Sequence, residues 1–241
     1  MIAAHWGMLL VAALSIIGAW GAASAQPSLL RLEVAAAIGV LAPLFWPGRG
    51  PTSSRTLLRV VAWPAAAAGS AALALLALPG QRWGGVVSTC AMLMAILVLS
   101  HAAAAALEWR WKGPDADAGS ARELAGRAVS GALLALGTLP FWLGPAAESL
   151  SARHPGIIDI VVALSPVTHL AVASGNDLLH NAWLYEHSNL AVLPVAYPAV
   201  GTLAAGYASA CALLAIAVLA SRQRRRPNSV LSTDLTQEQS R

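Results

Sequence analysis

Charged side chains are scarce in this sequence. They account for 11% of the 241 residues, whereas hydrophobic side chains account for 57%. A typical soluble domain contains about 25% charged residues. A chain with so few charges cannot cover its surface with polar groups, and its apolar runs follow one another too closely to leave room for a soluble domain. The composition therefore excludes an ordinary soluble protein and predicts an all-α membrane protein, with the lipid bilayer as its first partner.

Cysteines and catalytic motifs are scarce as well. The two cysteines, Cys90 and Cys211, lie in separate apolar runs without a Cys-x-x-Cys motif, which excludes paired-cysteine redox chemistry and a disulfide framework. The sequence contains neither Gly-x-Ser-x-Gly nor His-Glu-x-x-His, and Ala173-Ser174-Gly175 is only a fragment of a rhomboid-like serine motif. We therefore expect that the chain is not an enzyme and needs no cofactor.

Six apolar runs are long enough to cross a hydrocarbon core of about 30 Å, which takes about 20 helical residues. The predicted spans are Gly7–Ala25, Ser28–Trp46, Leu57–Leu78, Gly84–Leu107, Leu124–Pro145 and Leu190–Ala220. They predict one six-helix transmembrane domain over residues 1–226 and a disordered polar tail over 227–241. The first run ends in Ala23-Ser24-Ala25, which resembles a signal-peptidase site. No lysine or arginine precedes that run, however, so a span is favoured over a cleaved signal peptide.

The basic residues lie mainly on one side of this arrangement. Twelve of them flank the second and fourth loops or lie in the tail, namely Arg49, Arg55, Arg59, Arg110, Lys112, Arg122, Arg127, Arg222, Arg224, Arg225, Arg226 and Arg241, and three lie on the other side, namely Arg31, Arg82 and Arg153. Cytoplasmic loops are enriched in lysine and arginine. The bias therefore predicts a protein of the bacterial inner membrane with both termini in the cytoplasm. Because these arginines follow membrane topology, we expect no nucleic-acid partner.

One long loop, residues 146–189, faces outward in this topology, and it is not plainly hydrophilic. Its apolar stretch Ile157–Leu164 is too short to span. The next two residues predict a helix restart, with Ser165 as the N-cap and Pro166 in the first helical position. This helix should end at Gly175, because glycine is the usual residue just beyond a helix C-terminus.

A second short helix is expected over Leu178–His187, after which the last span begins. Short apolar helices of this kind lie at the membrane surface or dip into the bilayer, where protein must cover them. We therefore expect a broken re-entrant or interfacial segment that folds onto the mouth of the bundle. Its candidate residues for a substrate path or gate are Asp159, His169, Asp177, His180, Glu186 and His187.

Two other interpretations of these polar residues stay open. Imidazoles and carboxylates together are ligands for zinc or copper. The segment has no His-x-His or His-x-x-x-His spacing, however, and His180 and His187 are seven residues apart. The other interpretation is structural, with side chains that line a wet interface and cap helices.

Ionisable residues are rare within the predicted spans. His101 lies toward the cytoplasmic end of the fourth span, and Arg31 and Glu33 lie toward the outer end of the second. Charge within a membrane indicates function, but each of these residues is close enough to an interface for its polar end to reach water. No carboxylate lies near the middle of the membrane, which argues against a proton- or sodium-driven transporter acting alone.

The layout as a whole resembles the permease subunits of ABC-2-type transporters. That family also has six spans with both ends inside and a broken, re-entrant element between the fifth and sixth spans. Here the element would be Ile157–Ser174, broken at Ser165-Pro166. The chain departs from the family in two places. Only Met1–Trp6 precedes the first span, where the family has an amphipathic helix, and the loop Gly48–Thr56 is short for contact with a nucleotide-binding subunit.

This resemblance implies a permease-like subunit of a multi-component bacterial inner-membrane exporter. It also implies a separate ATPase subunit, because the chain has no Gly-x-x-x-x-Gly-Lys phosphate loop of its own. The alternative is a non-catalytic scaffold or accessory subunit of a larger membrane complex. The low polarity within the spans favours the scaffold, and the structured outer segment favours the permease.

Overall fold

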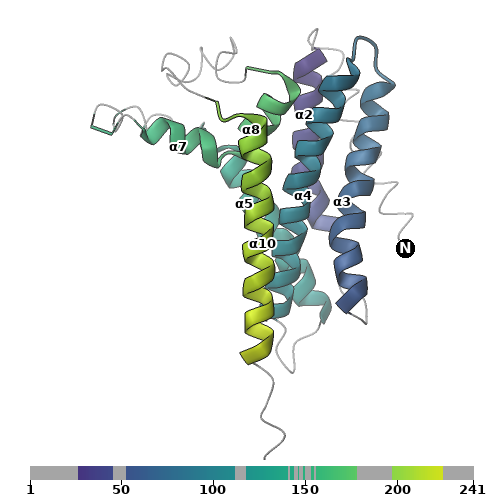
Figure 1. Ribbon diagram of the computed structural model, residues 1–241, viewed down its shortest axis with the longest axis vertical. Coiled ribbons are helices and arrows are strands. Elements are labelled where there is room, and N and C mark those ends of the chain that lie inside the picture. The colour runs from purple at the N-terminus through teal and green to yellow at the C-terminus, as the bar shows by residue number, and fades with distance from the viewer. Residues whose placement is uncertain are drawn as a thin grey trace, which may run out of the picture.

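The computed structural model describes residues 27–45, 53–111, 118–140, 156–177 and 197–224, together with residues 142–143, 146, 149 and 153–154. All regular secondary structure in these ranges is helical (Figure 1). The elements are α2 (Pro27–Leu41), η1 (Ala42–Phe45), α3 (Ser53–Leu76), α4 (Trp83–Trp111), α5 (Ala118–Gly137), α7 (Ile157–Leu164), α8 (Pro166–Ser174) and α10 (Val200–Arg224). The all-α prediction is therefore confirmed for the described residues. The expected helix over Leu178–His187 and the tail over 227–241 lie outside them.

The long helices run side by side and alternate in direction. In Figure 1, α2, α4 and α10 run downward from the end of the bundle at which α8 lies, whereas α3 and α5 run upward toward it. We call this end, which carries Pro27, the α3–α4 connection and α8, the α8 end. The six-span prediction requires the same alternation for spans two to six, because consecutive spans cross the bilayer in opposite directions.

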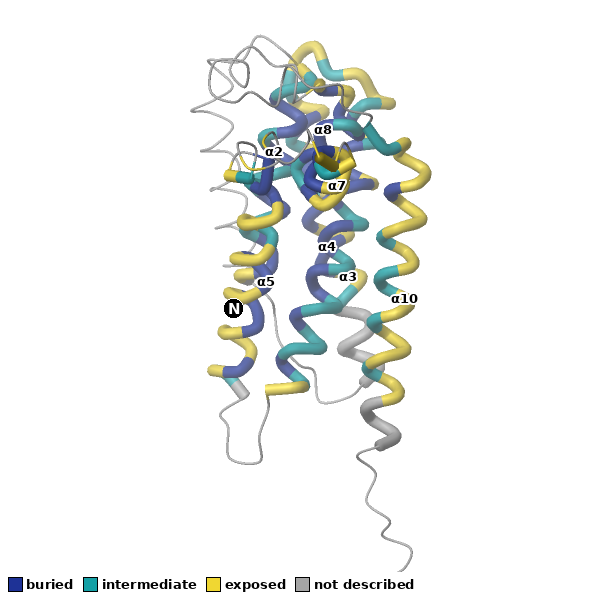
Figure 2. The backbone as a smooth tube through the Cα atoms, turned by 90° about the vertical axis from the view of Figure 1, so that its left-hand side faces the viewer, coloured by how far each residue is buried: buried dark blue, intermediate teal, exposed yellow. Residues whose placement is uncertain are grey.

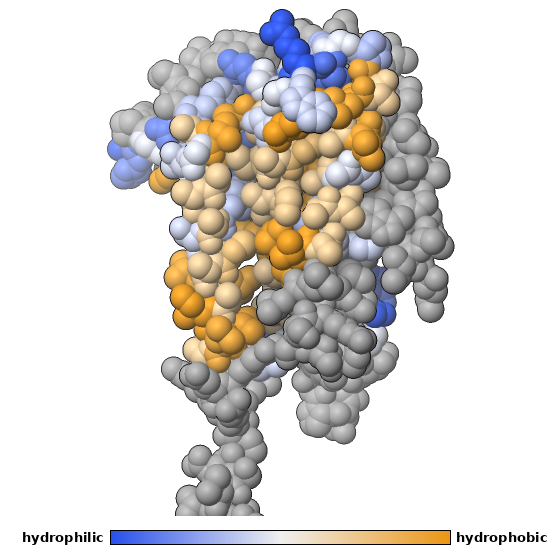
Figure 3. All heavy atoms as spheres, turned by 45° about the vertical axis from the view of Figure 1, so that its right-hand side comes forward, coloured by the Kyte–Doolittle hydropathy of each residue, from blue (hydrophilic) through white to orange (hydrophobic). Residues whose placement is uncertain are grey.

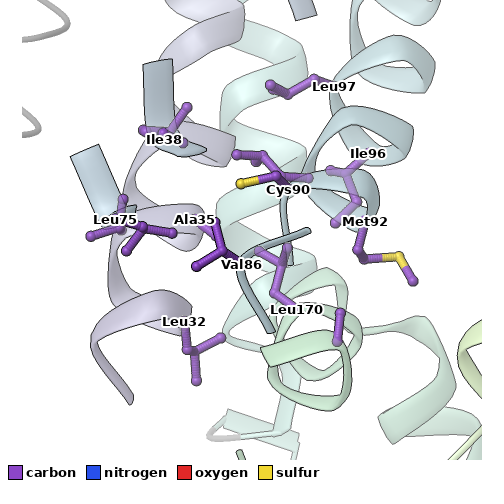
Figure 4. Packing of buried hydrophobic residues seen from close by; sticks show 14 of the residues in the cluster. Leu32, Ala35, Ile38, Leu75, Val86, Cys90, Met92, Ile96, Leu97 and Leu170 are labelled. Atoms are coloured by element: carbon purple, nitrogen blue, oxygen red, sulfur yellow. The ribbon is translucent and has the colours of Figure 1, made fainter. Parts of the chain in front are cut away.

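Helix α4 lies at the centre of the bundle and contacts α2, α3, α5, α8 and α10. Its buried residues are Val86, Thr89, Cys90, Met92, Leu93, Ile96, Leu97, Ser100, His101, Ala104 and Glu108. They recur at helical spacing, so that most of one broad face is covered by neighbours. Figure 4 shows the main core, in which Ile38 of α2, Leu75 of α3 and Leu170 of α8 belong to one cluster with the α4 residues.

Three described helices are long and apolar enough to cross a membrane: Pro27–Leu44, Trp83–Trp111 and Val200–Ala220, with 18, 29 and 21 residues. The bent pair α7–α8 is a fourth candidate if it forms one broken span. The apolar part of α3, Val60–Leu76, is shorter than a full span. The first predicted span, Gly7–Ala25, lies outside the described residues. The described helices are thus those of a membrane-embedded protein with three or four candidate spans, and six spans stay a prediction.

The predicted fifth span, Leu124–Pro145, does not match the bounds of α5, Ala118–Gly137. Hydropathy missed the polar first turns of this helix, which contain an exposed ion pair between Arg127 Nη2 and Glu123 Oε1 at 2.5 Å. The helix also ends sooner than predicted, ahead of Pro140. A proline ring has no N–H to donate and clashes with the carbonyl group four residues earlier.

Large apolar side chains cover the sides of the bundle, as Figure 3 shows for one face. Leu73 on α3 is 73% exposed, and Leu213 and Ile216 on α10 are 67% and 62% exposed. Helix α10 is the least covered span, since only 6% of its apolar stretch is buried within the chain (Figure 2). Contiguous apolar patches are unfavourable in water, whereas lipid tails are as apolar as leucine. These faces therefore suit a lipid environment.

Candidate functional site

The candidate site is α8, a helix of nine residues that lies almost entirely buried at one end of the bundle. Its buried residues are Thr168, His169, Leu170, Ala171, Ala173 and Ser174. Helices α2, α4, α5, α7 and α10 all contact it. At about 1.5 Å per residue it is about 14 Å long, less than half of a hydrocarbon core. Helix α8 thus lies at the end of the bundle and is too short to cross a membrane.

The break before α8 is built around Ser165. Its hydroxyl group accepts a hydrogen bond from the backbone N–H of Thr168 at 3.4 Å and donates one to the carbonyl oxygen of Gly137 in α5 at 3.2 Å. Pro166 follows in the first helical position, where its missing N–H would have no helical partner. Helices α7 and α8 meet here at an angle of 80°. The predicted restart is confirmed, and the bond to Gly137 attaches the start of α8 to the bundle.

The middle of α8 is held by His169, which is only 6% exposed. Its Nε2 lies 2.9 Å from the carbonyl oxygen of Ala163 in α7, and its Nδ1 lies 2.8 Å from the hydroxyl oxygen of Tyr207 in α10. A carbonyl oxygen only accepts hydrogen bonds, so Nε2 carries the proton and Nδ1 of the neutral ring accepts from the tyrosine. The two rings meet edge to face with centroids 5.6 Å apart. His169 therefore links both sides of the bend to α10.

The C-terminus of α8 is capped by a glycine and is contacted by an arginine of α2. Gly175 has a left-handed backbone with φ of 71°, and the N–H of Asn176 bonds to the carbonyl oxygen of Ala171 at 2.9 Å. These are the features of a Schellman motif, and the predicted stop at Gly175 is confirmed. Nη2 of Arg31 in α2 donates to the carbonyl oxygen of Ser174 at 2.7 Å. A cation at a helix C-terminus is stabilised by the helix dipole.

Arg31 lies in the interior, which corrects the expectation that its polar end reaches water. The residue is 8% exposed, and its Nη1 donates to Oε1 of Gln81 in the α3–α4 connection at 2.8 Å. Gln81 in turn donates to the carbonyl oxygen of Pro27 at 3.3 Å. The guanidinium group lies against Gly85 of α4, where an added Cβ would be 2.9 Å from its Cζ. The guanidinium group is thus enclosed by α4 and hydrogen-bonded to neutral oxygens of the α3–α4 connection and of α8.

His101 is fully buried, which corrects the expectation that its polar end reaches water. Its Nδ1 donates to the carbonyl oxygen of Leu97, one helical turn earlier, at 2.7 Å. Leu93 and Leu97 are themselves fully buried and cluster with Leu170 of α8. The centre of the bundle between His101 and α8 is therefore apolar and closely packed. The side chain of Glu33 is partly buried, and its Oε2 atom is enclosed by protein.

The structure describes three of the six predicted site residues and does not bring them together. His169 is buried among α7, α8 and α10, as described above. Asp159 is exposed on α7. Asp177 is exposed just beyond α8, where it accepts a hydrogen bond from the hydroxyl group of Tyr197 at 2.6 Å. The remaining three, His180, Glu186 and His187, lie outside the described residues.

Sequence reasoning missed two residues that hold α8, Gly137 and Tyr207, and it did not predict the contact that Arg31 makes with α8. Their partners on α8 and its N-cap are 28, 38 and 143 residues away in the chain. No local pattern reports contacts over such separations. Arg31 did stand out as an ionisable residue within a span, which was the one usable signal.

Two further observations bear on the chemistry of the site. No group of three His, Cys, Asp or Glu side chains comes together as a metal site within the described part of the chain. Comparisons with protein-family models, curated proteins and solved structures found no match. The interpretation of α8 therefore rests on its geometry.

Proposed function

We propose that this chain is a permease-like transmembrane subunit of a multi-component exporter in the bacterial inner membrane, and that α8 is its outer gate. The observation that carries this proposal is the position of α8. It is a nine-residue helix buried in the mouth of the bundle, with polar contacts at its start, middle and end. A short element packed into the end of the bundle closes the mouth and can leave it without dismantling a span.

The contacts that hold α8 are of a kind that can exchange. Ser165 and Tyr207 donate neutral hydrogen bonds, and such bonds in membrane proteins are each worth about 0.6 kcal/mol on average and rarely more than about 2 kcal/mol. The bond from Arg31 involves a charged donor and is worth about 1.5–3 kcal/mol. All three donors can bond to water when α8 moves. Two positions of α8 can therefore differ by only a few kcal/mol, as a gate requires.

Helix α7 is placed to act as the lever of this gate. It extends sideways from the bundle (Figure 1) and meets α8 at 80°. Val161 and Val162 are buried against the bundle, whereas Ile160 and Leu164 are 56% and 54% exposed. An amphipathic helix of this kind lies in the membrane interface. Movement of α7 there would reach α8 through the contact between Ala163 and His169.

The proposal includes six spans, both termini in the cytoplasm and a separate ATPase subunit. The alternating directions of α2, α3, α4, α5 and α10 support the layout (Figure 1). The distribution of basic residues, twelve on one side and three on the other, supports the orientation. An ATPase partner is needed because the chain carries no phosphate-loop motif.

A reversible lock on α8 tests the gate. An added Cβ on Gly137 of α5 would lie 4.0 Å from the Cβ of Val167 in α8, which is within the range for a disulfide. Gly137→Cys combined with Val167→Cys, in a chain whose Cys90 and Cys211 are replaced by serine, should form this bond on oxidation. The tagged complex is purified in mild detergent and its ATP turnover is measured. Turnover should fall on oxidation and recover with a reductant.

The two single-cysteine variants are the controls, because neither can form the intramolecular bond. Their ATP turnover should not respond to oxidation. Unchanged turnover in a fully cross-linked complex would contradict a gating role for α8.

The scaffold alternative is favoured by one specific observation, the packed apolar centre around Leu93 and Leu97. A subunit that does not move a substrate through its bundle needs no polar side chains along the bundle centre. Identification of the chains that co-purify with the tagged protein separates the two functions. A co-purifying ATPase supports the exporter subunit, whereas other membrane subunits without an ATPase support the scaffold.

A further inference from the structure

Three sources of positive potential meet at the start of α4. The helix begins at Trp83, and its N-terminus carries the positive end of the helix dipole. Arg82 directly precedes it and is exposed. The guanidinium group of Arg31 lies against Gly85, the third residue of the helix.

The backbone at this helix start is open to a ligand. The first hydrogen bond of the helix runs from the N–H of Val86 to the carbonyl oxygen of Arg82 at 3.1 Å, so the N–H groups of the three preceding residues have no helical partner. Gly84 is exposed, and a Cβ added to it would meet nothing within 4 Å. A ligand can therefore approach the N–H groups of Gly84 and Gly85 closely. Proteins commonly bind phosphate groups at helix starts of this form.

Arg31 provides an independent observation that points to an anion. Its guanidinium is buried, yet within the described part of the chain it contacts only the neutral oxygens of Gln81 and Ser174, and its Nε has no hydrogen-bond partner. Neither Arg31 nor Arg82 forms an ion pair with a described carboxylate. A buried charge is costly unless it is paired. Two arginines and a helix N-terminus thus lack a full counter-charge.

We propose that the start of α4 binds a phosphate group, through the N–H groups of Gly84 and Gly85 and the side chain of Arg82. Arg31 supplies a buried charge beside the ligand. The phosphate belongs either to a lipid headgroup or to a soluble anion. The site does not depend on an exporter function, because the groups that contact the phosphate belong to the start of α4 and to Arg82 directly before it. Since Arg31 also holds Ser174, the bound phosphate would be linked to the end of α8.

Titration of the purified full-length protein in a non-ionic detergent tests this site. The probes are inorganic phosphate and a short-chain phosphatidylglycerol, and the readout is the thermal shift as a function of probe concentration. Arg82→Gln should weaken binding about tenfold or more, because a charge-assisted hydrogen bond is lost. Arg122→Gln, an exposed arginine on α5 at the opposite end, is the matched control and should leave binding unchanged.

A second variant tests the same site by gain of stability. Gly84→Asp places a carboxylate at the helix N-terminus, so it should raise the melting temperature without a probe and abolish the shift caused by either probe. A shift with inorganic phosphate identifies a soluble anion as the ligand, and a shift with the lipid alone identifies a headgroup. Equal loss of binding in Arg82→Gln and Arg122→Gln, or no shift with either probe, would overturn the proposal.

Discussion

Tyr207 of α10 donates its hydroxyl proton to Nδ1 of His169 in α8 over 2.8 Å, while Nε2 of the same ring bonds to Ala163 in α7 over 2.9 Å. One imidazole therefore joins three helices at the point where the chain turns by 80°. Loss of either bond would leave a buried nitrogen without a partner, which is unfavourable in a membrane interior. His169 thus fixes the middle of α8 to both α7 and α10.

Tyr207→Phe should loosen α8 without unfolding the protein. The substitution removes the hydroxyl group but keeps the ring against His169, so the expected loss is about 0.5–1.5 kcal/mol. Hydrogen exchange across residues 166–174, measured by mass spectrometry, should become faster. Tyr197→Phe is the matched control, because its hydroxyl group bonds to the exposed Asp177. Equal exchange in wild-type protein and Tyr207→Phe would show that the contact does not hold α8.

Ser165→Ala should destabilise the protein by about 1–2 kcal/mol, because it removes an N-cap together with the bond to Gly137. The measurement is thermal unfolding in detergent. Ser70→Ala is the control. Among the described residues, the hydroxyl group of Ser70 bonds only to the carbonyl oxygen of Ala67 within its own helix, and its loss should change stability by less than about 0.5 kcal/mol. A similar effect of both substitutions would argue against the break as a structural anchor.

Two glycines of α5 should respond in opposite ways to alanine. An added Cβ on Gly126 would lie 2.7 Å from the carbonyl oxygen of Pro43 in η1, a backbone atom that cannot rotate away. Gly126→Ala should therefore cost about 1–3 kcal/mol. Gly131 has nothing within 4 Å of such a Cβ, and Gly131→Ala should stabilise the helix by up to about 1 kcal/mol. Thermal melting of the two variants measures the difference, and the reverse order would exclude the close approach of α5 and η1.

Reporter fusions should give the orientation of the chain. Fusions after Arg49, Lys112 and Arg226 should be active as cytoplasmic reporters, because these positions lie on the arginine-rich side. A fusion near His154 should be active only as an external reporter. A cytoplasmic signal at His154 would contradict the six-span topology and would move α8 to the other side of the membrane.

The sequence by itself determined the membrane class and the local breaks. Composition predicted the helical membrane protein, because a chain with 11% charged residues needs an apolar solvent. The limits of α8 followed from Ser165, Pro166 and Gly175, whose effects act on the backbone within a few residues. The same kind of local reasoning placed α7 at Ile157–Leu164. The hydropathy criterion used for the spans was less accurate for α5, because it does not register the polar first turns of that helix.

Only the tertiary structure decided which polar groups are buried and what they contact. Arg31 and His101 were expected to reach water, yet both are buried. The partners of Arg31 lie 50 and 143 residues away in the chain, and the tyrosine bonded to His169 lies 38 residues away. Hydrogen bonds at such separations are selected by the packing of whole helices. The physical reason is that a buried polar group needs a partner from whichever element packs beside it, and residue spacing carries no record of that element.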